Sequence, residues 1–86
     1  GTAQLALTLT DAAGQPLETD SLEVEGNMNH AGMVPVFATL RSTTAGRYEG
    51  SLEFTMAGDW FLLVSGQLAD GRRIDQKIDV PGVQHP

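Results

Sequence analysis

The segment Arg47-Tyr48-Glu49-Gly50-Ser51-Leu52-Glu53-Phe54 has the most regular alternation of side chains in the 86-residue chain. Charged or small polar residues occupy every second position, and the positions between them are Tyr48, Gly50, Leu52 and Phe54. A period of two is typical of a β-strand that buries one face and exposes the other to water. The segment therefore predicts a strand with a solvated outer face, and it sets the pattern to look for elsewhere.

Five further segments have the same or a related pattern, and residues that favour turns separate them. They are residues 3–10, 21–26, 34–41, 60–65 and 73–80. In the third of them, the residues expected to face the core are Val34, Val36, Ala38 and Leu40. Residues 60–65 form an almost continuous apolar run, which is typical of a central strand covered on both faces or nearly so.

No long stretch shows the period of about 3.6 residues that marks an amphipathic helix. Six or seven short antiparallel strands with turns between them predict an all-β fold, an immunoglobulin-like β-sandwich. A small open barrel is the alternative architecture. Because the chain has no cysteine, core packing alone would hold either fold together.

The composition limits the possible functions. Five Lys and Arg residues against eleven Asp and Glu residues give a net charge of −6, which disfavours nucleic acid and anionic membranes as partners. The longest apolar run is far shorter than a membrane-spanning helix requires, and the sequence begins with Gly rather than Met. We therefore expect one domain, residues 1–86, that belongs to a larger or membrane-anchored protein or to a processed chain.

Residues 27–35, Asn-Met-Asn-His-Ala-Gly-Met-Val-Pro, have neither a strand period nor a helix period and are expected to form a loop. Gly32 lets the backbone turn, so that Met28, His30 and Met33 could face one point. Thioether sulfur combined with imidazole nitrogen selects copper, especially Cu(I), over hard cations that prefer oxygen. In the alternative interpretation, the two methionines close one end of the core and His30 points to water.

The order of the strands adds a fourth ligand candidate. Short connections reverse the chain direction at each step, so alternate connections lie at the same end of an antiparallel sandwich. The loop at residues 27–35, the turn with Met56 and the tail with His85 are therefore expected at one end. We expect Met56 to complete the ligand set of that loop, whereas His85 is too near the end of the chain to be a favoured ligand.

Each candidate also has a structural interpretation. Met28 continues the inward parity of the strand at residues 21–26, so it can be a core residue instead of a ligand. Met33 precedes an inward set that starts at Val34, which places Met33 off the core face and favours a role in binding. Asp59 is expected to form a hydrogen bond in its turn rather than to bind metal.

Enzymatic chemistry has little support. The chain has no Gly-x-Ser-x-Gly elbow, no phosphate-binding glycine loop, no His-Glu-x-x-His pair and no dinucleotide fingerprint. Its glutamates occupy alternate strand positions, so we expect them on solvated strand faces rather than in a catalytic pair. Tyr48 and Trp60 are expected in the core. We therefore expect a protein that is not an enzyme.

Three features follow one another along the chain. They are Met28-x-His30-x-x-Met33-x-Pro35 after a strand, Gly46-Arg47-Tyr48-Glu49-Gly50, and Phe54-Thr55-Met56-Ala57-Gly58-Asp59-Trp60. In this order they resemble the YtkA-like and FixH-like domain family over about residues 20–80. The loop departs from many relatives, which read more like Met-Pro-x-Met-x-His.

The resemblance implies an extracytoplasmic, immunoglobulin-like domain, periplasmic or in the cell envelope, that takes part in copper handling or in assembling copper-containing membrane oxidases. It also implies a protein partner for transfer or assembly. One hypothesis is a copper-binding domain for copper transfer or homeostasis, which holds Cu(I) through Met28, His30, Met33 and Met56. The other is a metal-free structural or protein-interaction domain of a larger envelope protein, whose methionines form an apolar contact surface.

Overall fold

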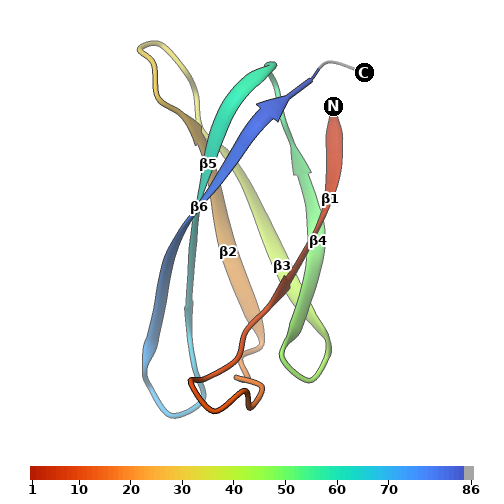
Figure 1. The fold of residues 1–86 in the computed structure, drawn as a ribbon, viewed down its shortest axis with the longest axis vertical. Coiled ribbons are helices and arrows are strands. Elements are labelled where there is room, and N and C mark those ends of the chain that lie inside the picture. Colours follow the sequence, from red (N-terminus) through yellow and green to blue (C-terminus); the bar gives the residue numbers. More distant parts are fainter. Residues whose placement is uncertain (85–86) are drawn as a thin grey trace.

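The structure, a computed structural model, describes residues 1–84. Their strands are β1 (Thr2–Thr8), β2 (Ser21–Met28), β3 (Val36–Thr44), β4 (Arg47–Glu53), β5 (Gly58–Gln67) and β6 (Arg73–Val83). All six belong to one antiparallel sheet with the order β1-β4-β3-β2-β5-β6 (Figure 1). The prediction of an all-β antiparallel fold is confirmed. No helix among these residues is long and apolar enough to cross a membrane.

The sheet curls so that its inner face encloses one hydrophobic core (Figure 1). Phe54, directly after β4, packs edge-on against Trp60 of β5 with ring centroids 5.1 Å apart, although β4 and β5 are not neighbours in the sheet. The buried core consists of Leu22, Val24, Leu40, Tyr48, Leu52, Phe54, Trp60, Leu62 and Val64. The result is a sandwich-like fold in which β1 and β6 are the two edges of the sheet.

The alternation expected for β4 is confirmed, since Tyr48 and Leu52 are buried between exposed neighbours. The expectation that the strand at residues 60–65 is covered on both faces is wrong. β5 alternates as well, with Trp60 buried and Leu63 41% exposed. Because all described strands belong to one sheet whose inner face is turned to the core, the outer face of β5 remains open to solvent.

The third strand begins later than the sequence pattern predicts. Val34 is 77% exposed, whereas Val36 packs partly buried against the core and Leu40 is buried. Pro35 has no backbone N–H to donate to a neighbouring strand, so pairing with β2 starts at Val36, opposite Gly26. The inward position predicted for Val34 is therefore wrong, and this residue belongs to the β2–β3 connection.

The prediction that alternate connections lie at the same end of the fold is confirmed for the described residues (Figure 1). The β2–β3 and β4–β5 connections lie at the same end of the sheet because Met28 at the end of β2 pairs with Trp60 near the start of β5. The last residues of β6 reach the same end, where Val83 pairs with Gly58. We call the region formed by residues 28–35 and 54–59 the methionine end, because it contains all three methionines of the chain.

Tyr48 ties the long β1–β2 connection to the other end of the sheet. Its side chain is fully buried, and its hydroxyl donates to the carbonyl oxygen of Leu17 at 2.7 Å. The same hydroxyl oxygen accepts the backbone N–H of Thr19 at 3.0 Å. These two bonds satisfy backbone groups that no strand partner serves, so the irregular connection has a fixed place on the sheet.

Gly46 makes a close approach in this region that a larger residue could not. Its φ is +74°, and a Cβ atom added to it would lie 2.8 Å from Pro16 Cβ and 2.9 Å from the carbonyl oxygen of Leu9. Gly14 has a similar φ of +82° but has nothing within 4 Å of the added atom. Both glycines thus have a strained backbone conformation for any other residue, but only Gly46 is also crowded by neighbouring atoms.

We expect Gly46→Ala to lower the free energy of unfolding by about 3 kcal/mol, because it adds a steric clash to the strain of a positive φ. Gly14→Ala is the matched control, with an expected loss of about 1 kcal/mol from the φ alone. Urea unfolding followed by Trp60 fluorescence measures both. Equal losses in the two variants would contradict the close packing of Gly46 against the β1–β2 connection.

Candidate metal centre

Met28 and the turn that carries Met56 are in contact. Gly58 has a φ of +128°, and a Cβ atom added to it would lie 2.8 Å from Met28 Cε. The missing side chain of Gly58 thus leaves room for the Met28 thioether, two residues along the chain from Met56. This contact places Met28, at the end of β2, next to the segment that follows Met56.

Trp60 holds the backbone of the same turn from the core side. The indole is 2% exposed, and its Nε1–H donates to the carbonyl oxygen of Met56 at 2.9 Å. Because the indole also packs against Phe54, the turn cannot move without disturbing the core. The Met-x-Gly-x-Trp spacing noted in the sequence therefore has a structural reason: Met56 supplies the acceptor, Gly58 the space and Trp60 the donor.

Met56 is the most accessible of the three methionines at this end, with 44% of its surface exposed. Asp59, in the same segment, does not bond within its own turn as the sequence suggests. Its carboxylate accepts the backbone N–H of Gly82 from β6 at 2.9 Å. The bond ties the end of β6 to the start of β5, next to the place where the pairing register of these strands shifts.

Met28 and Met33 both pack, partly buried, against the hydrophobic core. For Met28 this agrees with its inward parity. For Met33 the prediction that it lies off the core face is wrong, because the connection bends at Gly32, whose φ is +80°, and Val34 rather than Met33 is turned to solvent. The two side chains close this end of the core, with their burial incomplete.

His30 is exposed on the β2–β3 connection. Its Nδ1 lies 3.3 Å from the carbonyl oxygen of Ala31. In the tautomer with the proton on Nδ1, that contact is a hydrogen bond, and Nε2 carries the lone pair that a metal ion needs. His85, the other histidine at this predicted end, lies outside the described residues.

The donor set at the methionine end consists mainly of thioethers. Within residues 1–84, no three or more His, Cys, Asp or Glu side chains are grouped so that they could hold a metal ion. A metal bound here would thus depend on Met28, Met33 and Met56 with His30 as the one nitrogen donor. Neutral soft donors of this kind fit Cu(I) and fit Zn²⁺, Ca²⁺ or Mg²⁺ poorly.

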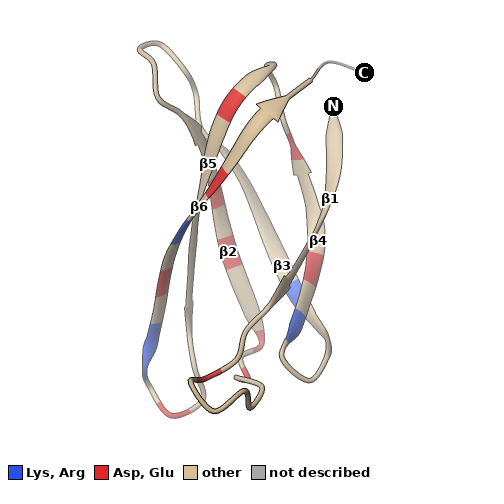
Figure 2. Cartoon of the chain, viewed as in Figure 1, with Lys and Arg blue, Asp and Glu red and all other residues tan. Residues whose placement is uncertain are grey.

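The charged side chains around this end are acidic (Figure 2). Glu53 and Asp59 flank the β4–β5 turn, and both are exposed. The basic side chains all lie outside the methionine end and are Arg41, Arg47, Arg72, Arg73 and Lys77. An approaching cation therefore meets no Lys or Arg side chain within residues 28–35 and 54–59.

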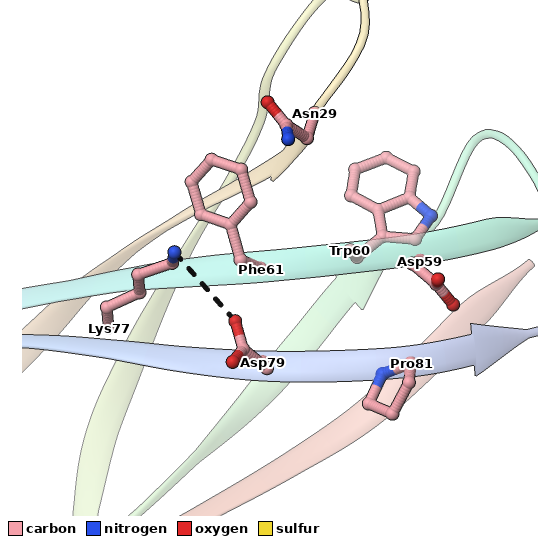
Figure 3. A pocket seen from close by; sticks show the side chains of 7 residues that line it. All are labelled: Asn29, Asp59, Trp60, Phe61, Lys77, Asp79 and Pro81. Carbon is pink, nitrogen blue, oxygen red and sulfur yellow. Dashed lines mark ion pairs between the residues drawn. The ribbon is translucent and has the colours of Figure 1, made fainter.

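Beside the methionine end, the outer face of β5 and β6 has a hollow of about 440 Å³ (Figure 3). It is lined by Asn29, Asp59, Trp60, Phe61, Lys77, Asp79 and Pro81. Lys77 Nζ lies 4.9 Å from the centre of the Phe61 ring and 4.0 Å from the Asp79 carboxylate. The sequence interpretation missed this hollow because it treated residues 60–65 as covered on both faces. The charged residues at every second position of residues 73–79 were the signal in the sequence that this face is open to solvent.

The model of the family described as YtkA-like matches residues 1–65 of the chain. No curated protein and no solved structure matches significantly.

Proposed function

Because the chain belongs to the YtkA-like family and gathers its three methionines with His30 at one end of the sheet, we propose that it is a copper-binding domain that holds Cu(I). The observation that carries the proposal is the contact of Met28, at the end of β2, with Gly58, at the start of β5, which brings the strand ends that lead into the two connections together. The family resemblance to copper-handling domains points in the same direction. The proposed ligands are Met28, His30, Met33 and Met56.

The partial burial of two of these methionines is compatible with a ligand role. Met28 and Met33 pack against the core without being fully buried, so both side chains keep some access to solvent. Methionine has three rotatable bonds and adapts its packing more easily than other core residues. Met56 and His30 are exposed, so both side chains are accessible to an ion from solvent.

The chemistry of these ligands favours transfer over catalysis. Thioethers and a neutral imidazole bind Cu(I) without adding negative charge, and they release it to a site with thiolates or more donors. Exposed ligands on a connection can be reached by a second protein. We therefore propose copper as cargo, passed to a protein partner outside the cytoplasm, by a domain that is not an enzyme.

The metal-free alternative also has an observation in its favour. Met28 and Met33 fill the end of the core, as an apolar closure would. The two functions differ in what His30 does. In a structural domain this exposed imidazole has no role, whereas in a copper site it is the one nitrogen ligand.

Replacing His30 with alanine is expected to weaken Cu(I) binding by about tenfold or more, because one of four ligands is lost. Unfolding stability should change by less than about 0.5 kcal/mol, since the side chain is exposed. Asn29→Ala, one residue away and also exposed, is the matched control and should bind as the unaltered chain does. Competition with a chromogenic Cu(I) chelator under anaerobic conditions measures all three proteins. An unchanged affinity in His30→Ala would remove this residue from the site and favour the metal-free alternative.

A further inference from the structure

β6 is an edge of the sheet with an apolar cleft along its inner side. No strand of residues 1–84 pairs with its free edge. Between β6 and the opposite edge strand β1 lies a cleft of about 370 Å³, to which β6 contributes Ile74, Gln76 and Ile78. Ile74 and Ile78 are only half-buried there, and Gln76 is exposed. An unpaired edge beside apolar surface is a place where another strand can add.

Charged residues of alternating sign follow one another along β6 (Figure 2), and their spacing of two residues puts them all on its outer face. In order they are Arg73, Asp75, Lys77 and Asp79, and all four side chains are exposed. Each basic residue pairs with the acidic residue that follows it, at 3.6 Å for Arg73 and 4.0 Å for Lys77. Figure 3 shows Lys77 and Asp79 side by side on this face. Their cross-strand neighbours on β5 are uncharged, so β5 offers these four side chains no opposite charge.

We infer that the free edge of β6 binds β6 of a second copy of this chain, antiparallel, with Gln76 of each copy opposite the other. In this register Arg73 faces Asp79 of the second copy. Asp75 likewise faces Lys77 of the second copy, and the two-fold symmetry repeats both pairs. Every charge on the face then has an opposite charge across the interface as well as along its own strand, which stabilises a sheet pair.

The inner face and the ends of the strand fit the same register. Ile74 faces Ile78 of the second copy, so apolar side chains meet over the cleft, and the two Gln76 amides can bond to each other. Gly71, in the hairpin turn, and Pro81, which has no N–H to donate, lie five positions on either side of Gln76. The hydrogen-bonded ladder between the two copies of β6 would thus end at the hairpin turn on one side and at Pro81 on the other.

Other registers and the other edge are less favourable. A shift of two residues in either direction places Asp75 opposite an aspartate, either its own copy or Asp79, which is destabilising. A shift of one residue turns the apolar row outward. The exposed row of β1, by contrast, has no charge to select a register and consists of Thr2, Gln4, Ala6 and Thr8.

The antiparallel arrangement places the two methionine ends at opposite ends of the dimer. Both remain accessible, so self-association and Cu(I) binding are expected to be independent. Loss of one by mutation leaves the other measurable.

Sedimentation equilibrium of the 86-residue chain tests the proposal, with a dimer expected at concentrations of about 100 µM and above. Asp75→Lys and Lys77→Asp each place like charges opposite each other twice, so each alone should raise the dimer dissociation constant by about tenfold or more. Mixing these two variants should restore a dimer with one chain of each, because the lysine introduced in one chain then faces the aspartate introduced in the other. The variant that carries both exchanges should dimerise like the unaltered chain.

Two controls separate the β6 register from general charge effects. Asp20→Lys changes the net charge as Asp75→Lys does, at an exposed position outside β6, and should leave the dimer intact. Gln76→Cys should form an intermolecular disulfide under mild oxidation, since the two Cβ atoms would lie about 5 Å apart, whereas Asp75→Cys should not. A monomer at about 1 mM would overturn the proposal. So would a dimer that persists in both single-charge variants.

Discussion

Replacing Met28 and Met56 together with leucine is expected to weaken Cu(I) binding by about a hundredfold or more. Each substitution removes one thioether and keeps an apolar side chain of similar volume. The fold should remain, with a loss of less than about 1.5 kcal/mol in unfolding free energy, because Met56 is 44% exposed and Met28 only partly buried. A large loss of affinity with little loss of stability separates ligands from packing residues.

Leu63→Met is the matched control for this experiment. Leu63 is 41% exposed on the outer face of β5, away from the methionine end, so the change adds a thioether where no site is proposed. Its Cu(I) affinity should equal that of the unaltered chain in the same anaerobic chelator competition. If the double leucine variant kept its affinity within about threefold, the thioethers of Met28 and Met56 would not be ligands.

Replacing Trp60 with alanine is expected to cost about 4 kcal/mol of unfolding free energy, a large part of the stability of a small domain. The indole is 2% exposed, packs against Phe54 and donates to the Met56 carbonyl oxygen. Urea unfolding followed by circular dichroism measures the loss, since the only tryptophan is removed.

Trp60→Phe separates packing from the hydrogen bond. It keeps an aromatic ring but leaves the Met56 carbonyl without its donor, so we expect a loss of about 2 kcal/mol and a Cu(I) affinity lowered severalfold. A loss below about 1 kcal/mol in Trp60→Ala would contradict the position of this residue at the centre of the core.

The strands and the shared end could be predicted because their signals are local. The period of two in β4 needs no knowledge of the rest of the chain, and short connections that reverse direction place alternate connections together. The common position of Met28, His30, Met33 and Met56 at one end is therefore predictable from the sequence alone. Their ligation of copper stays a prediction.

The orientation of single side chains was less predictable, because it depends on contacts distant in sequence. Pro35 delays β3, and the bend at Gly32 then turns Val34 rather than Met33 to solvent. The coverage of residues 60–65 depends on whether a second layer exists over β5, which no property of that run can show. The cleft beside β6 likewise depends on which strands become edges, and strand order is a property of the whole sheet.

The residues that carry the family resemblance mainly shape the backbone. Gly46 allows the close approach of Pro16, and Tyr48 holds the β1–β2 connection. Gly58 makes room for Met28, and Trp60 fixes the turn of Met56. These residues thus explain how the methionines are presented, and the proposed copper binding depends on the methionines and His30 themselves.

The most direct test of a copper-binding function is an anaerobic Cu(I) titration against a chromogenic chelator, with methionine-methyl and amide NMR shifts followed in parallel. We predict one equivalent bound with a dissociation constant of about 1 µM or tighter. Shifts should be confined to the methionine end, with all three methionine methyl groups and His30 affected. A chain that takes no copper from the chelator, or that binds with shifts elsewhere on the sheet, would contradict the proposed function.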